Sequence, residues 1–180
     1  AGEMVEDYWM ALLRDIDFGE YNSDADVTAA CVDLNNMSDF HGPKSGGLVT
    51  PATLFRGNSL GCDKGPYLSQ FFYLPCPFGV IEIDQKARVP VAGDDFMENF
   101  SEWKFIQEGN SPTRTQTYEA SRRYLKCGRD ISEWVHRDEL FQAYFIASLI
   151  LLGRGCPLNP GNPYLTTHSN QEPFGTLGGP

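Results

Sequence analysis

The longest apolar run in the chain lies between Leu140 and Leu152, where only Gln142 and Ser148 are polar. A helix that is apolar on every side is buried in protein or spans a membrane. Thirteen residues are too few for a span, which needs about 20. The pattern therefore predicts a buried core helix over 138–153. The other predicted helices offer one apolar stripe each, so part of its surface should face the rest of a longer protein or another subunit.

Several amphipathic patterns predict helices that could surround it. The first has apolar residues at helical spacing with acidic residues opposite, and the second follows a cap at Ser23 or Asp24. A third is expected after a capping box formed by Asp95 and Glu98. The apolar stripes of the three are Met4, Val5, Tyr8, Trp9, Leu12 and Leu13; Val27, Ala30, Cys31 and Leu34; and Phe96, Phe100, Trp103 and Ile106.

Two further helices and two short extended segments complete the prediction. One helix is expected from Pro66 to about Tyr73, with Pro at its first position, and another over 114–135. Residues 81–83 and 88–91 alternate weakly between Pro and Gly and are expected to be extended. The predicted fold class is all-α, a helical bundle around the 138–153 helix. Both ends look cut, so residues 1–180 are interpreted as the N-terminal or middle helical part of one larger domain.

Composition and charge exclude some partners. The 180 residues are 41% hydrophobic and 13% aromatic, which makes a packed core feasible. The formal charge is −10, and the 14 basic residues are scattered without a run. We therefore expect neither nucleic-acid binding through phosphate contacts nor attachment to an anionic membrane surface. The sequence has no targeting signal and no predicted membrane span.

No group of residues makes a self-sufficient active site. His136 lies near Asp130, Glu133 and Asp138 and could act as a base with an orienting carboxylate, but a surface histidine at a helix junction is the favoured interpretation. His41 and His168 lie in loop-like sequence and are interpreted in the same way.

Neither a metal site nor a dense disulfide framework is indicated. Residues 22–26 resemble the start of a calcium loop without its Gly and closing Glu, and a helix cap explains them better. The five cysteines include no C-x₂-C pair, so a zinc site is not indicated. Cys31 and Cys127 fall in helical patterns and should be buried thiols, whereas Cys62 and Cys76 lie in loop-like sequence and could bridge in an oxidising compartment.

Several blocks of the sequence resemble the vanadium-dependent haloperoxidases of the algal bromoperoxidase type. They are EMVEDYWMALLRDIDF at 3–18, LFRG at 54–57, GPYLSQF at 65–71, WKFIQEG at 103–109, the stretch 138–155, and FGTLGGP at 174–180. The blocks keep the family's order over nearly the whole chain.

The resemblance implies an enzyme that oxidises bromide or iodide with hydrogen peroxide and halogenates organic substrates. It also implies a vanadate cofactor bound by one histidine and held by a lysine, arginines and a serine. In the family these residues follow the FG-x-x-GG-P segment, so they are expected beyond Pro180, and this chain is expected to hold no catalytic, cofactor-binding or metal residue. This chain would supply the scaffold, the mouth of the substrate channel and the subunit interface.

The resemblance carries further expectations. We expect a homo-oligomer, which needs the rest of the protein, in an extracellular, cell-wall or other extracytoplasmic compartment. In such a compartment we expect a Cys62–Cys76 disulfide, which would close a loop of about 15 residues. Some members hold calcium in a loop that corresponds to 162–171, but these residues include no carboxylate here, so that site is doubtful.

Two other functions are compatible with the sequence. An acid phosphatase shares the fold family, because vanadate and phosphate are alike in shape and charge. A non-enzymatic helical interaction module is the third hypothesis.

Overall fold

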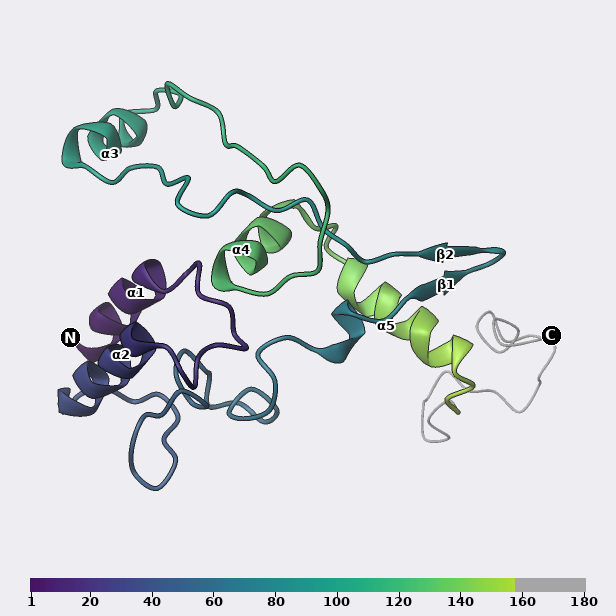
Figure 1. Cartoon of the computed structure of the whole chain (residues 1–180), viewed down its shortest axis with the longest axis horizontal. Helices are drawn as coiled ribbons and strands as arrows, with labels where there is room; N and C mark the ends of the chain where they lie inside the picture. The colour runs from purple at the N-terminus through teal and green to yellow at the C-terminus, as the bar shows by residue number, and fades with distance from the viewer. Residues whose placement is uncertain (158–180) are drawn as a thin grey trace. The chain divides into compact units, whose positions relative to one another are not determined.

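A computed structural model describes residues 1–157, so the predictions for His168 and for the 162–171 loop lie outside the described residues. The chain divides into two compact units. Unit 1 comprises Ala1–Leu68 and Lys86–Arg137, and unit 2 comprises Ser69–Gln85 and the chain from Asp138 onward. Figure 1 labels the elements of both, and each unit is described by itself.

Helix α2 (Ala25–Asn36) organises the core of unit 1. Its predicted cap is confirmed, because the Asp24 carboxylate accepts hydrogen bonds from the backbone N–H groups of Asp26 and Val27, both at 2.9 Å. Its predicted stripe is also confirmed and lies wholly inside the core, which consists of Leu13, Tyr21, Val27, Ala30, Cys31, Leu34, Phe40, Val49 and Leu54.

Helix α1 (Gly2–Leu12) packs against α2 along only half of its predicted stripe. Trp9 is half-buried against the core and Leu13 is buried, whereas Tyr8 and Leu12 are exposed. The helix is therefore confirmed, but its apolar arc is wider than the face that α2 covers.

The helix predicted over 114–135 is wrong in its first half. Helix α4 spans Gly128–Arg137, while the preceding residues pair with the extended segment at 87–91. Backbone hydrogen bonds run from Ala87 N to Arg123 O at 2.8 Å and from Glu119 N to Val89 O at 3.0 Å. This pairing overrides the local helical pattern, and it confirms that residues 88–91 are extended.

Helix α3 (Phe100–Gln107) begins later than predicted because Asn99 is its cap. The Asn99 side chain accepts a hydrogen bond from Glu102 N at 2.9 Å. The capping box of Asp95 and Glu98 is therefore wrong, and the Asp95 carboxylate binds arginines instead.

Unit 2 contains the only sheet among the described residues. Strands β1 (Cys76–Phe78) and β2 (Ile81–Ile83) pair antiparallel, with Cys76 opposite Ile83, which confirms the extended prediction at 81–83. The turn places Gly79 at φ 62°, a conformation that glycine adopts without strain. The helix predicted from Pro66 to Tyr73 is wrong. Only the 3₁₀ turn η1 (Gln70–Phe72) forms, because its cap is Ser69 and too few residues follow before Pro75.

The helix predicted over 138–153 is confirmed, but the described chain does not bury it as a core helix. Helix α5 spans Gln142–Gly153, and Ile150, 2% exposed, is its one buried residue, whereas Leu140 before it and Tyr144 within it are highly exposed. Within unit 2 the helix packs on the hairpin, where the Phe78 and Phe145 rings meet edge to face at 6.1 Å. A hairpin and one 3₁₀ turn are too small to surround a helix that is apolar on every side.

Helices are the main regular structure of the described chain, but it is not the all-α bundle that the sequence predicts. Unit 2 holds no other α-helix beside α5 among its described residues, and it includes an antiparallel sheet.

Cys31 and Cys127 are buried as predicted. Cys62 is exposed, whereas Cys76 is buried with its Sγ 4.0 Å from the backbone oxygen of Ile146. The Cys62–Cys76 disulfide stays a prediction. No helix in the described part of the chain is long and apolar enough to cross a membrane.

Candidate functional site

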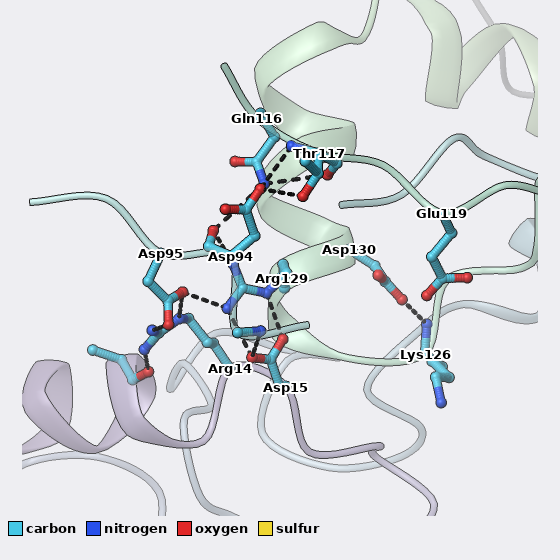
Figure 2. A network of polar contacts seen from close by, with 12 residues as sticks. Arg14, Asp15, Asp94, Asp95, Gln116, Thr117, Glu119, Lys126, Arg129 and Asp130 are labelled. Carbon is cyan, nitrogen blue, oxygen red and sulfur yellow. Dashed lines mark hydrogen bonds and ion pairs between the residues drawn. The ribbon is translucent and has the colours of Figure 1, made fainter. Parts of the chain in front are cut away.

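The most extensive polar feature of unit 1 is a network of arginines and carboxylates around the start of α4 (Figure 2). Arg129, in the first turn of α4, donates from Nη2 to Asp15 at 2.7 Å and to Asp95 at 2.5 Å. Arg14 forms a second ion pair with Asp95. One guanidinium thus joins the chain that follows α1, the 93–95 turn and α4.

The backbone brings these groups together. The Arg129 N–H donates to Arg14 O at 2.8 Å, which docks the start of α4 on the end of the α1 segment. A Cβ at Gly128 would lie 3.4 Å from the Arg14 backbone, an ordinary van der Waals contact, so the two backbones pack closely here. On the other side, the Gly93 N–H donates to the Asp15 carboxylate at 3.1 Å.

Asp94, the neighbour of Asp95, fastens a different segment. Its carboxylate accepts hydrogen bonds from Thr117 N at 2.6 Å, Thr117 Oγ1 at 2.5 Å and Gln116 Nε2 at 2.8 Å, and it pairs with Arg114. These contacts close the base of the excursion that carries α3.

A third group of contacts anchors the loop before α4. Asp130 is fully buried and binds Arg123 through both carboxylate oxygens, at 2.5 and 3.1 Å. The same guanidinium reaches Glu119 at 3.0 Å, and Lys126 N donates to Asp130 at 2.8 Å. Asp130 therefore holds both side chain and backbone of the segment that leads into its own helix.

The electrostatics favour the charged form of these groups. The hydrogen bond from Arg129 lowers the pKa of Asp15, and hydrogen bonds from Arg14 and then Arg129 lower the pKa of Asp95. The Thr117 hydroxyl, the Thr117 N–H and Arg114 lower the pKa of Asp94 to about 2. Hydrogen bonds to Asp15 and Asp95 raise the pKa of Arg129. Carboxylates held ionised in this way do not exchange protons near neutral pH, so the network is suited to fastening segments and not to acid–base catalysis.

The sequence-predicted candidate His136 is not part of such a dyad. It is exposed on α4, while Asp130 and Glu133 have other partners. Asp130 binds Arg123, and Glu133 accepts a hydrogen bond from the Tyr118 hydroxyl at 2.8 Å and pairs with Arg137. His41 is likewise exposed.

Sequence reasoning missed the network because its members lie far apart in the chain. Arg129 and Asp15 are 114 positions apart. In the sequence Asp95 is interpreted as part of a capping box with Glu98, and this local pattern gives no sign of its arginine partners.

The described residues fit neither a metal ion nor vanadate. They contain no group of three or more His, Cys, Asp or Glu side chains that could hold a metal. The arginines that gather in the network bind carboxylates, and so they do not form a cationic pocket for a trianion. Fold and network together define a structural segment whose helices and loops are held by partly buried ion pairs.

Comparisons with known proteins identify the family of this segment. No protein-family model matches the chain. It is 30% identical to vanadium-dependent bromoperoxidases of Corallina pilulifera and Corallina officinalis, over 98% of this chain and 36% of each relative. It is also 30% identical to the vanadium-dependent bromoperoxidase of Ascophyllum nodosum, over 85% of this chain and 28% of that protein.

A solved structure of a vanadate-dependent bromoperoxidase also resembles this chain. The second vanadate-dependent bromoperoxidase from Ascophyllum nodosum, a homohexamer, matches 85% of this chain and 26% of its own with a TM-score of 0.79 and 29% identity. The chain belongs to the family of vanadium-dependent bromoperoxidases. It spans about a third of the length of the curated relatives that it matches.

Proposed function

We propose that the intact protein to which this chain belongs oxidises bromide with hydrogen peroxide, using vanadate, and thereby halogenates organic substrates. The observation that carries the proposal is 30% identity to vanadium-dependent bromoperoxidases over 98% of this chain. The match in fold to a solved vanadate-dependent bromoperoxidase also supports it.

The proposed role of residues 1–180 is scaffold, channel mouth and subunit interface, with the vanadate-binding residues outside this chain. The network supports this division of labour. Its arginines are engaged with Asp15, Asp95 and Asp130, so they position helices instead of holding an oxyanion.

The test is a bromide-oxidation assay on the intact protein, prepared free of vanadate and then reconstituted. Activity should require both vanadate and peroxide. Phosphate should compete with vanadate, because the two oxyanions have similar shape and charge. Cleavage of phosphate esters without vanadate, and no halide oxidation with it, would support an acid phosphatase instead. A protein with neither activity would support the interaction module.

Assembly and location are part of the same proposal. The homohexameric relative supports a homo-oligomer. An extracytoplasmic location is proposed from the family resemblance alone, and the 162–171 loop offers no carboxylate for calcium.

A further inference from the structure

The chain contains two Asn-x-Ser sequences, at 36–38 and at 99–101. Asn-x-Ser is the acceptor sequence for N-linked glycans, which are bulky and polar and therefore lie on a protein surface. The sequence by itself does not separate the two, because both fit the pattern equally. The structure separates them through the backbone conformation and the hydrogen bonds of each asparagine.

Asn36 ends α2 on the side of the helix that faces away from the core. The apolar stripe of α2 lies in the core, whereas Asn36 is exposed, as are Val32 and Asp33 one turn before it. Met37 has φ −88° and ψ 116°, an extended conformation that ends the helix. Ser38, which follows, is also exposed. The asparagine and the hydroxyl of this sequence are therefore both accessible, and the backbone between them is not helical.

The amide nitrogen of Asn36 is not used by the fold. Its neighbour Asn35 donates from Nδ2 to Val49 O at 2.9 Å and accepts from Val49 N at 2.8 Å. Asn110 likewise donates from Nδ2 to Phe105 O at 2.8 Å. Among residues 1–157, Asn36 Nδ2 has no such acceptor. A sugar on this nitrogen would therefore break no hydrogen bond of the described chain.

Asn99, in the second sequence, has a structural role instead. Its side chain caps α3 by accepting a hydrogen bond from Glu102 N at 2.9 Å. Phe100 and Ser101 form the first turn of that helix, so the hydroxyl follows the asparagine along a helical backbone. The capping bond holds the Asn99 amide over the turn. The structure therefore favours Asn36 over Asn99 as an acceptor.

We propose that Asn36 is the attachment site of an N-linked glycan. This inference rests on the extracytoplasmic location of the proposed function, because the transfer takes place on the secretory route. The donor is an oligosaccharide linked to a polyprenyl diphosphate. The bond from the sugar C1 to the diphosphate oxygen breaks, and a bond from C1 to Asn36 Nδ2 forms. The amide nitrogen gives one proton to a base of the transferase, polyprenyl diphosphate leaves, and nothing is oxidised or reduced.

The test is mass spectrometry of tryptic peptides from the intact protein, purified from the cells that make it. Cleavage after Arg14 and Lys44 gives the peptide 15–44, which contains Asn36, and the peptide 89–104 contains Asn99. The peptide 15–44 should carry the added mass of a glycan, and 89–104 should not. Peptide N-glycosidase should remove this mass and convert the Asn36 amide into a carboxylate. An unmodified peptide 15–44, or a glycan on 89–104 alone, would overturn the proposal.

Variants of the intact protein identify the acceptor sequence. Asn36→Gln and Ser38→Ala should each abolish the glycan on the peptide 15–44, whereas Ser38→Thr should keep it, because threonine supplies the same hydroxyl. Asn22→Gln is the matched control, since Asn22 is exposed in the same peptide but is not followed by the acceptor pattern. A glycan that persists in Ser38→Ala would contradict the assignment.

Cell fractionation and bromide oxidation, measured on the same preparations, separate this inference from the proposed function. A protein that lies outside the cytoplasm without a glycan contradicts the assignment of Asn36 alone. A protein without a glycan inside the cytoplasm contradicts both the assignment and the proposed location. Bromide oxidation should be the same in all the variants, because none of the substituted residues belongs to the proposed catalytic machinery.

Discussion

Two adjacent carboxylates of unit 1 fasten different segments. Asp94 holds Thr117 and its neighbours, whereas Asp95 holds Arg14 and Arg129. Burying charge costs desolvation energy, so such pairs contribute little net stability compared with apolar packing. Breaking one is costly all the same, because the remaining charge is left buried without its partner. The network therefore fixes where segments meet more than it strengthens the fold.

Replacing Arg129 should lower the stability of the protein, because its carboxylate partners would lose their counter-charge. The Arg129 side chain is 10% exposed and that of Asp95 is 15% exposed. Arg129→Met should destabilise the protein by roughly 3 kcal/mol, because Asp15 and Asp95 lose their shared partner. Arg129→Lys should cost less but still weaken the protein, since an ammonium cannot donate in a fork. The measurement is the urea midpoint of unfolding. Lys126→Met, which breaks an exposed pair with Asp17 at 3.7 Å, should change stability by less than about 1 kcal/mol.

Stability should fall in acid through the same carboxylates. The pKa values of Asp15, Asp94 and Asp95 are lowered in the folded protein, that of Asp94 to about 2. The unfolded chain then binds more protons than the native one, so their contribution is complete above about pH 4 and is lost as pH falls through the folded values. Melting temperatures between pH 6 and pH 2 should show this. The difference between the native protein and Asp94→Asn should shrink toward pH 2, and a difference independent of pH would contradict the assignment.

At the scale of elements, the burial of an apolar face depends less on its size than on the elements that pack against it. Helix α2 has one stripe, and that stripe is buried, whereas α5 is apolar on every side and buries only Ile150 among the described residues. Helix α1 lies between these cases, with Trp9 packed on the core and Tyr8 exposed. An apolar face is buried only as far as the neighbouring elements reach.

Two substitutions on α2 should separate core from surface. Leu34 is fully buried and Val32, on the same helix, is exposed. Leu34→Ala should destabilise by about 2–5 kcal/mol, through lost transfer energy and the cavity left behind. Val32→Ala should change stability by less than about 0.5 kcal/mol. Circular dichroism during thermal unfolding measures both, and equal effects would place the core elsewhere.

At the scale of the whole molecule, this chain is part of a family whose curated members are about three times as long. Unit 2 illustrates the consequence, because within it α5 has a two-stranded hairpin and a 3₁₀ turn as its main partners. Apolar patches of more than a few hundred Å² are rarely exposed on soluble monomers. We expect the remaining surface of α5 to be covered by other parts of the intact protein or by another subunit.

Residues 1–180 expressed alone should therefore aggregate or bind an apolar dye strongly, and should not oxidise bromide with vanadate and peroxide present. The reasons are the exposed residues of α5, such as Leu140 and Tyr144, and a network whose arginines are occupied by carboxylates. Light scattering and dye fluorescence, compared with the intact protein, measure the first expectation. A monomeric segment that melts cooperatively without binding the dye would contradict it.

The sequence by itself determined the features that depend on near neighbours. The cap at Asp24 and the stripe that includes Val27 and Leu34 follow from contacts three and four residues apart, which a helical period records directly. The short extended segment at 81–83, between Gly79 and Asp84, was found for a similar local reason. The family was identifiable as well, because long blocks of residues keep the family's order.

Only the tertiary structure decided the features that depend on distant partners. The sequence pattern of residues 114–127 predicts a helix. In the structure their backbone instead forms hydrogen bonds with the backbone of Ala87 and Val89. The sequence also predicts Asp95 as a helix cap, whereas in the structure its carboxylate binds Arg14 and Arg129. The burial of α5 depends on what packs around it, which its own residues do not encode. The periodicity of a segment indicates the secondary structure that its own residues favour. Contacts with residues distant in sequence determine whether that structure forms and which surfaces it buries.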